Sequence, residues 1–171
     1  MKIFIFIALL FCAGCVSFSR EEQSVMLGQN NGRYTVERKG VSVIAMPERG
    51  APLKGQFRFE LYLTPHAPGI SLAPQFIELH INGRVFLLKE VFLSDLTKAQ
   101  REGDGLKRLE LNQEIILDNL EKTTSFVLGF NTSSPPPGKL FSLDLTRALQ
   151  NGPEIKFKKI SRMRFSLIFK D

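Results

Sequence analysis

Alternation of apolar and polar residues with a period of two is the feature that most constrains how this chain folds. Successive side chains of a β-strand point to opposite faces, so this period predicts a strand with one buried and one solvated face. Residues 57–64 are the strongest example, because four apolar side chains share one face: Phe57, Phe59, Leu61 and Leu63. We expect a strand there that packs its apolar face into the core.

The same alternation continues at residues 77–81, and a second apolar run follows at residues 85–88. Asn82-Gly83 lies between the two runs. Both residues accept the positive φ angles of a type I′ turn, which is the common two-residue connection of a β-hairpin. The two strands should therefore be neighbours.

Further strands are predicted at residues 34–37, 41–46, 106–117, 126–130, 140–143 and 155–169. The last of these contains a phase break, because Ile160 has the opposite parity to Phe157 and Met163. A bulge, or two short strands, is expected near residues 158–161.

Helix signals are few and short. Ser94 and Asp144 offer N-caps, and Gly103 and Gly152 offer C-terminal glycines, so residues 94–103 and 144–152 are predicted to be connector helices. Many short strands without long alternating helices predict an all-β fold. We expect an immunoglobulin-like or transthyretin-like two-sheet β-sandwich with one or two short connector helices.

The N-terminus has the parts of an export signal. Lys2 supplies positive charge, residues 3–11 form an apolar stretch, and Ala13-Gly14 are the small residues that a signal peptidase requires beside the bond it cuts. The apolar stretch is shorter than the roughly 20 residues of a transmembrane helix. An ordinary secretory signal cut elsewhere stays an alternative, as does a CxxC redox motif from Cys12 to Cys15.

Residues 10–15, Leu-Phe-Cys-Ala-Gly-Cys, resemble the lipobox of bacterial lipoproteins. The resemblance covers residues 1–15 only, and Cys12 stands where the family most often has Leu. It implies removal of a signal peptide, residues 1–14, a diacylglycerol thioether and an N-acyl chain on Cys15, and attachment to a lipid bilayer. Val16 is not the Asp that retains enteric lipoproteins in the inner membrane, which implies the bacterial outer membrane, with the protein facing the periplasm or the cell surface.

Cleavage at this position would leave Cys15 as the only cysteine, so the mature domain would contain no internal disulfide. Residues 15–32 are polar and lack a sustained period, which predicts a lipidated N-terminus and a flexible tether. Residues 33–171 are numerous enough to bury a core of their own, and we expect them to form one β-sandwich domain.

The sequence contains no catalytic or metal-binding motif, and we predict a non-enzymatic protein without a metal or a cofactor other than the acyl chains. His66 falls in a predicted turn and His80 on the polar face of a predicted strand, and neither belongs to an HExxH or paired CxxC pattern. A hydrolase stays a weaker alternative, because geometry and not sequence order defines a catalytic triad.

The net charge of +6 falls by one when Lys2 is removed. In an exported chain this balance favours anionic lipid headgroups, lipopolysaccharide phosphates or cell-wall carboxylates over nucleic acid as partners. A candidate site for an anionic partner lies in the last strand: Lys156, Lys158, Lys159, Arg162 and Arg164. These residues are equally typical of a charged edge that prevents strand-to-strand aggregation.

These observations give one leading hypothesis and one main alternative. The leading hypothesis is an outer-membrane-anchored lipoprotein that binds another envelope protein, or supports an envelope assembly, through surface complementarity and exposed strand edges. It is similar in size, anchor and expected sandwich to the small lipoprotein of type VI secretion membrane complexes. This is an analogy of architecture, because no residues match beyond the lipobox. The alternative is a binding module for anionic glycolipid or cell-wall polymer. No nucleic-acid partner is expected.

Overall fold

The computed structural model describes residues 14–27, 35–38, 40–48, 55–94, 105–150 and 152–169, and for residues 14–21 and 164–169 it describes the backbone alone. In this part of the chain the regular structure is β, apart from one short 3₁₀ helix, η1 (Pro74–Phe76). The predicted all-β class is confirmed, whereas the finer assignment to an immunoglobulin-like or transthyretin-like sandwich stays a prediction.

The described strands form one antiparallel ten-stranded sheet and one small sheet. Along the large sheet the order is β1 (Gly14–Met26), β12 (Glu154–Phe169), β11 (Leu140–Asp144), β6 (Glu78–Ile81), β7 (Arg84–Ser94), β10 (Thr124–Phe130), β4 (Phe57–Pro65), β3 (Val41–Pro47) and β2 (Thr35–Arg38), with β8 (Leu106–Leu109) also paired to β7. The small sheet consists of β5 (Ser71–Leu72) and β9 (Ile115–Ile116).

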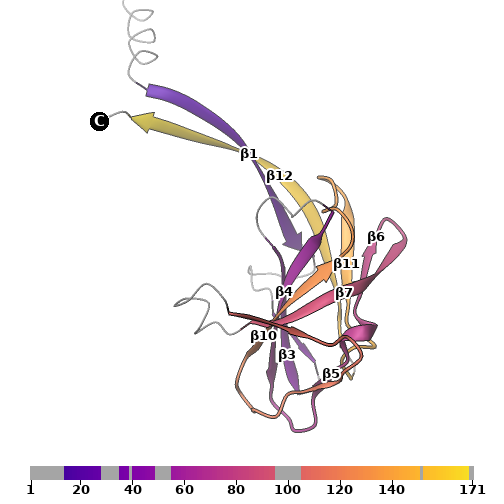
Figure 1. Ribbon diagram of the computed structural model, residues 1–171. Coiled ribbons are helices and arrows are strands. Elements are labelled where there is room, and N and C mark those ends of the chain that lie inside the picture. The colour runs from indigo at the N-terminus through magenta and orange to yellow at the C-terminus, as the bar shows by residue number, and fades with distance from the viewer. Residues whose placement is uncertain are drawn as a thin grey trace, which may run out of the picture.

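Strand β7 joins the two halves of the large sheet. Its first residues pair with β6, and its later residues pair with β10 and β8. The register with β10 shifts between Gly129 and Phe130, so Lys89 is an extra residue on the β7 side. A bulge of this kind increases twist and bends the strand. The bend lets the sheet curl until its two halves face each other (Figure 1).

Phenylalanine side chains from both halves meet inside the curl. Phe59 on β4 is fully buried, and its ring centroid lies 5.7 Å from that of Phe157 on β12 and 6.3 Å from that of Phe141 on β11. Phe130 on β10 completes the contact at 6.0 Å. Because β4 and β12 are far apart in the sheet order, these contacts close the core.

The strongest sequence predictions are confirmed. Along β4 the predicted apolar face is buried, while the residues between are partly exposed. Asn82 and Gly83 have φ angles of 52° and 75°, as a type I′ turn requires, and β6 and β7 pair on either side of them. The predicted strand at residues 106–117 is instead divided into β8 and β9, since a turn closed by the Gln113 amide and the Glu110 carbonyl lies between them.

Of the two predicted connector helices, the one at residues 144–152 is not observed in the described chain. Residues 145–150 form turns, with a single helical-type hydrogen bond from the Leu149 amide to the Leu145 carbonyl, and Leu149 bridges to Leu72 on β5. The return from β11 to β12 instead buries Leu145 and Leu149, and the Ala148 carbonyl accepts a hydrogen bond from the Ala73 amide next to β5. The other predicted helix, residues 94–103, lies outside the described residues after Ser94, which ends β7.

The predicted bulge near residues 158–161 is also wrong. Strand β12 pairs with β1 without a register shift, from Phe157 opposite Met26 to Phe169 opposite Gly14. In this part of β12 the strand leaves the core, and Met163 is 65% exposed. Because neither face of the strand is buried in the core there, the position of Ile160 in the alternation does not indicate a bulge.

Strand β1 replaces part of the predicted flexible tether. Residues 15–26 are extended and paired with β12, while residues 28–34 lie outside the described chain. Pairing between β11 and β12 ends at Lys158, so beyond it β1 and β12 form a two-stranded ribbon that projects from the body (Figure 1). The ten steps from Ser24 to Gly14 span about 33 Å at roughly 3.3 Å per residue. The polar run from Ser19 to Ser24 is compatible with a strand here, because β12 supplies its backbone hydrogen bonds.

Replacing Phe59 with alanine tests the closure of the core. We expect the free energy of unfolding to fall by about 3–5 kcal/mol, because the change removes a fully buried ring and leaves a cavity between the two halves. Urea denaturation followed by circular dichroism measures this loss. The control is Leu87→Ala at a side chain that is 64% exposed, for which a change of at most about 0.5 kcal/mol is expected. Similar losses in both variants would contradict the proposed packing.

Burial raises the pKa of Tyr62 on β4 to about 12, and a 2.8 Å hydrogen bond from its hydroxyl to Glu60 Oε2 acts in the same direction. The folded protein therefore keeps this phenol neutral between pH 10 and pH 12, where the unfolded chain ionises. The stabilisation is complete below pH 10 and is lost as the pH rises toward 12. Between pH 9 and pH 11.5 we expect wild-type stability to fall more steeply than that of Tyr62→Phe in urea denaturation. An equal fall in stability with pH in the two proteins would contradict the coupling between Tyr62 ionisation and unfolding.

Candidate functional site

Strand pairing aligns two rows of polar side chains on the outer face of β6, β11 and β12. The inner face of these strands carries buried residues such as Leu79 and Phe157, so the alternate positions point outward. The first row is acidic and runs directly across the three strands: Glu78, Asp144 and Glu154. The second row lies beside it: His80, Ser142 and Lys156.

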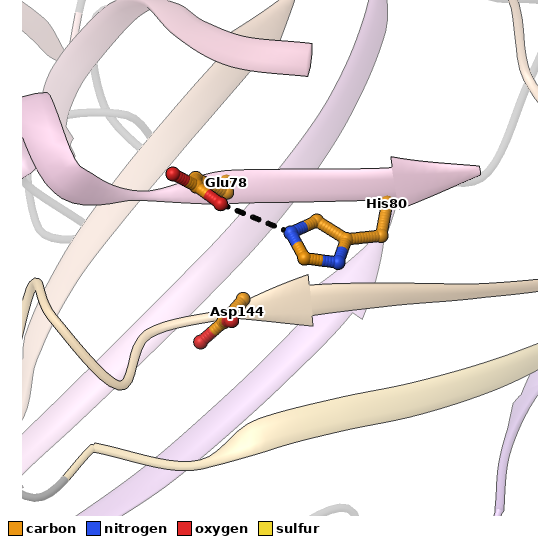
Figure 2. A group of neighbouring side chains, drawn as sticks. All are labelled: Glu78, His80 and Asp144. Carbon is orange, nitrogen blue, oxygen red and sulfur yellow. Dashed lines mark hydrogen bonds and ion pairs between the residues drawn. The ribbon is translucent and has the colours of Figure 1, made fainter. Parts of the chain in front are cut away.

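Three of these side chains converge. One ligand atom each from Glu78, His80 and Asp144 lies within 4.8 Å of the other two. Figure 2 shows Glu78 and His80 on one strand and Asp144 on its neighbour, with the imidazole directed toward the carboxylates. His80 Nε2 is 3.1 Å from Glu78 Oε2, and both side chains are partly buried, with 34% and 21% of their surface exposed.

Nearby groups orient the cluster and offset part of its charge. Asp144 Oδ1 accepts a 2.8 Å hydrogen bond from the Thr146 amide. Arg147 Nη1 is 3.8 Å from Glu78 Oε1, and the guanidinium lies 4.8 Å from the centre of the Phe76 ring. On the far side of the acidic row, Lys156 Nζ is 3.5 Å from a Glu154 carboxylate oxygen.

Ser142 and His80 are directly opposite each other, but they do not form a nucleophile and its base. The Ser142 hydroxyl donates to Glu154 Oε1 at 2.7 Å, and His80 Nε2 is directed to Glu78. A nucleophilic triad requires a hydrogen bond between the hydroxyl and the imidazole.

A second histidine does have triad-like bonding. Ser42 Oγ is 2.6 Å from His66 Nε2, and His66 Nδ1 is 2.8 Å from Glu121 Oε1. However, Ser42 lies within β3, which pairs with strands on both sides, so its own amide is part of the sheet. The Glu121 side chain is 72% exposed, unlike the buried carboxylate that holds a catalytic histidine. We interpret this chain of hydrogen bonds as a brace between β3 and the segments that follow β4 and precede β10.

A groove of about 530 Å³ opens beside the first cluster. His80, Ser142 and Lys156 contribute its polar part, and Leu27 and Leu140 its exposed apolar part. On the other margin of the same face, Leu87 lies opposite Glu78 and Val85 lies opposite His80, and both are more than half exposed. The outer face thus combines exposed apolar side chains with a polar centre.

The structure divides the predicted basic cluster. Lys156, Lys158 and Arg162 share one parity of the continuous strand, and Lys158 and Arg162 are exposed. Lys159 has the opposite parity and is 12% exposed; its Nζ donates to Ser134 Oγ at 2.8 Å and lies 3.5 Å from Glu22 Oε2. The side chain of Arg164 lies outside the described residues. The basic surface therefore contains fewer free cations than the sequence indicates.

Cys15 belongs to β1 and pairs with Ile168 near the outer end of the ribbon. The described residues include no helix of the length and hydrophobicity that crossing a bilayer requires. Comparison of the chain with protein-family models, with curated proteins and with solved structures gave no match.

Proposed function

We propose that this protein is a lipid-anchored lipoprotein of the bacterial outer membrane, whose non-enzymatic β domain binds another envelope protein. The observation that carries the proposal is the position of the lipobox-like sequence relative to the ribbon. Residues 10–15 end where β1 begins, and Cys15 lies at the end of the ribbon that is distant from the body (Figure 1).

In this proposal the ribbon formed by β1 and β12 is a stalk between the membrane and the body. Acyl chains on Cys15 would hold it in the bilayer, since each buried methylene contributes about 0.8 kcal/mol and two or three chains together resist exchange. A paired stalk of about 33 Å also restricts the orientation of the body more than a single flexible chain would.

The binding surface that we propose is the outer face of β7, β6 and β11. Its exposed apolar side chains include Val85, Leu87 and Leu140, which surround a polar centre. Exposed apolar groups near polar ones are typical of protein interfaces. The groove beside this face is open to solvent along the sheet, a shape that suits a protein partner better than an enclosed small molecule.

The body behind this face supports a two-layer interpretation of the fold. Phe57 and Phe59 on β4 contact Phe141 on β11, so the halves of the curled sheet pack face to face. We propose that the body is a β-sandwich of immunoglobulin-like or transthyretin-like type, in which the outer faces are free for recognition.

Binding of an anionic glycolipid or cell-wall polymer is the second candidate. It is favoured by the shared parity of Lys156, Lys158 and Arg162 along β12. It is less well supported than a protein partner, because Lys156 pairs with Glu154 and Lys159 pairs with Glu22.

Substitution of Cys15 tests the anchor. In cells fed a labelled fatty acid, we expect Cys15→Ser to lose the label and to leave the membrane fraction, because the acylated sulfur and the processing site are both removed. Cys12→Ser is the matched control and should retain label and membrane attachment. Mass spectrometry of the mature N-terminus should identify acylated Cys15 as the first residue. An unmodified Cys15, or a mature chain that still carries residues 1–14, would overturn the anchor.

Photo-crosslinking tests the binding surface. A crosslinking amino acid at Leu87, on the outer face, should trap one discrete envelope protein in living cells. The same amino acid at Ile116 on β9 is the matched control, because Ile116 is 62% exposed and Leu87 is 64% exposed. We expect no discrete product from position 116.

The variant Lys158→Glu/Arg162→Glu separates the two candidates. Loss of salt-sensitive binding to purified envelope polymer, with crosslinking at Leu87 absent, would favour the glycolipid or polymer candidate. Retained crosslinking at Leu87 in this variant would favour a protein partner. Equal products at positions 87 and 116 would contradict the proposed surface.

A further inference from the structure

We infer that Glu78, His80 and Asp144 form a binding site for one divalent transition-metal ion of the Zn²⁺ class. This inference is independent of the lipid anchor and of the envelope partner. It rests on the ligand set, on the sheet that holds it, and on the charges that surround it.

The ligand set fits one ion. Zn²⁺ binds imidazole nitrogen and carboxylate oxygen at about 2.0–2.2 Å, so tetrahedral ligand atoms lie roughly 3.4 Å apart. The three ligand atoms here already lie within 4.8 Å of one another. Side-chain rotations that move each atom by about 1 Å are enough to bring them to bonding distance.

The backbone beneath the site is fixed before any ion binds. Strand β6 pairs with β7 and β11, and β11 pairs with β6 and β12, so both strands have hydrogen-bonded neighbours on each side. Glu78 and His80 are two residues apart on the same face of β6, and Asp144 lies directly opposite Glu78. Ligands on rigid, paired strands keep their geometry, and little ordering is required on binding.

The charges favour a cation. Three carboxylates stand in one row across adjacent strands, and like charges directly opposite each other destabilise a sheet. Lys156 pairs with Glu154 at 3.5 Å, whereas the cation paired with Glu78, Arg147, is 66% exposed and 3.8 Å away. The repulsion between Glu78 and Asp144 is therefore offset only in part. A divalent ion between Glu78 and Asp144 would match the two negative charges.

The donor types indicate which ion. Ca²⁺ and Mg²⁺ prefer six or more oxygen ligands including water, whereas imidazole nitrogen with carboxylate oxygen is typical of Zn²⁺ and its first-row neighbours. Three protein ligands leave one coordination position for water or for an atom of a bound molecule. His80 also lines the 530 Å³ groove, whereas Glu78 and Asp144 lie outside its lining.

Isothermal titration with ZnCl₂ tests the site. The sample is the full chain in detergent. It carries the substitutions Cys12→Ser and Cys15→Ser, because free thiols would themselves bind the metal. One equivalent of Zn²⁺ should bind, and millimolar Ca²⁺ or Mg²⁺ should not displace it. Asp144→Asn and His80→Gln should each weaken binding at least tenfold. Asparagine at position 144 keeps the side-chain size and an oxygen that can accept the hydrogen bond from the Thr146 amide.

Three matched variants complete the test. His66→Gln changes the other histidine and Glu154→Gln changes the neighbouring carboxylate of the acidic row, so both should alter the affinity less than threefold. Arg147→Met should tighten binding a few-fold, because it removes a competing cation. Circular dichroism should show that every variant is folded. Absence of one-to-one binding, or binding lost in His66→Gln and retained in His80→Gln, would overturn the inference.

Discussion

The contact of Phe59 with Phe141 and Phe157 is the interaction on which the rest of the structure depends, because it joins the two halves of the curled sheet. Without it, β4 and β12 would be distant parts of an open sheet with an exposed apolar face. With it, β11 and the first half of β12 become part of the core. The outer polar face and the projecting ribbon both follow, since they are the far side and the continuation of these strands.

The sequence predicts those features in which local pattern and tertiary burial agree. Phe57, Phe59, Leu61 and Leu63 alternate because one face of β4 is buried along its whole length. The Asn82-Gly83 turn is similarly local, since its geometry depends on two residues. In contrast, Ile160 is apolar on a strand that has left the core, and the apolar parity there predicts a bulge that does not exist.

The candidate site depends on information that the sequence does not display. Glu78 and His80 are visible as a same-face pair, but Asp144 is far away in the chain and reaches them only through the β6–β11 register. A shift of one residue would turn Asp144 to the core. The pairing of β1 with β12 is equally non-local, and the polar composition of β1 is compatible with a flexible segment. The basic residues of β12 are predictable as a group, but the burial of Lys159 is not.

The ribbon also has a consequence for the order of assembly. Val16 pairs with Leu167, so strands β2 to β11 lie between the two partners in the chain, and closing so large a loop delays pairing. During synthesis from the N-terminus, β1 has no partner until β12 has been made. Residues 14–26 would therefore remain unpaired until then. The projecting ribbon is then the last part of the large sheet to form.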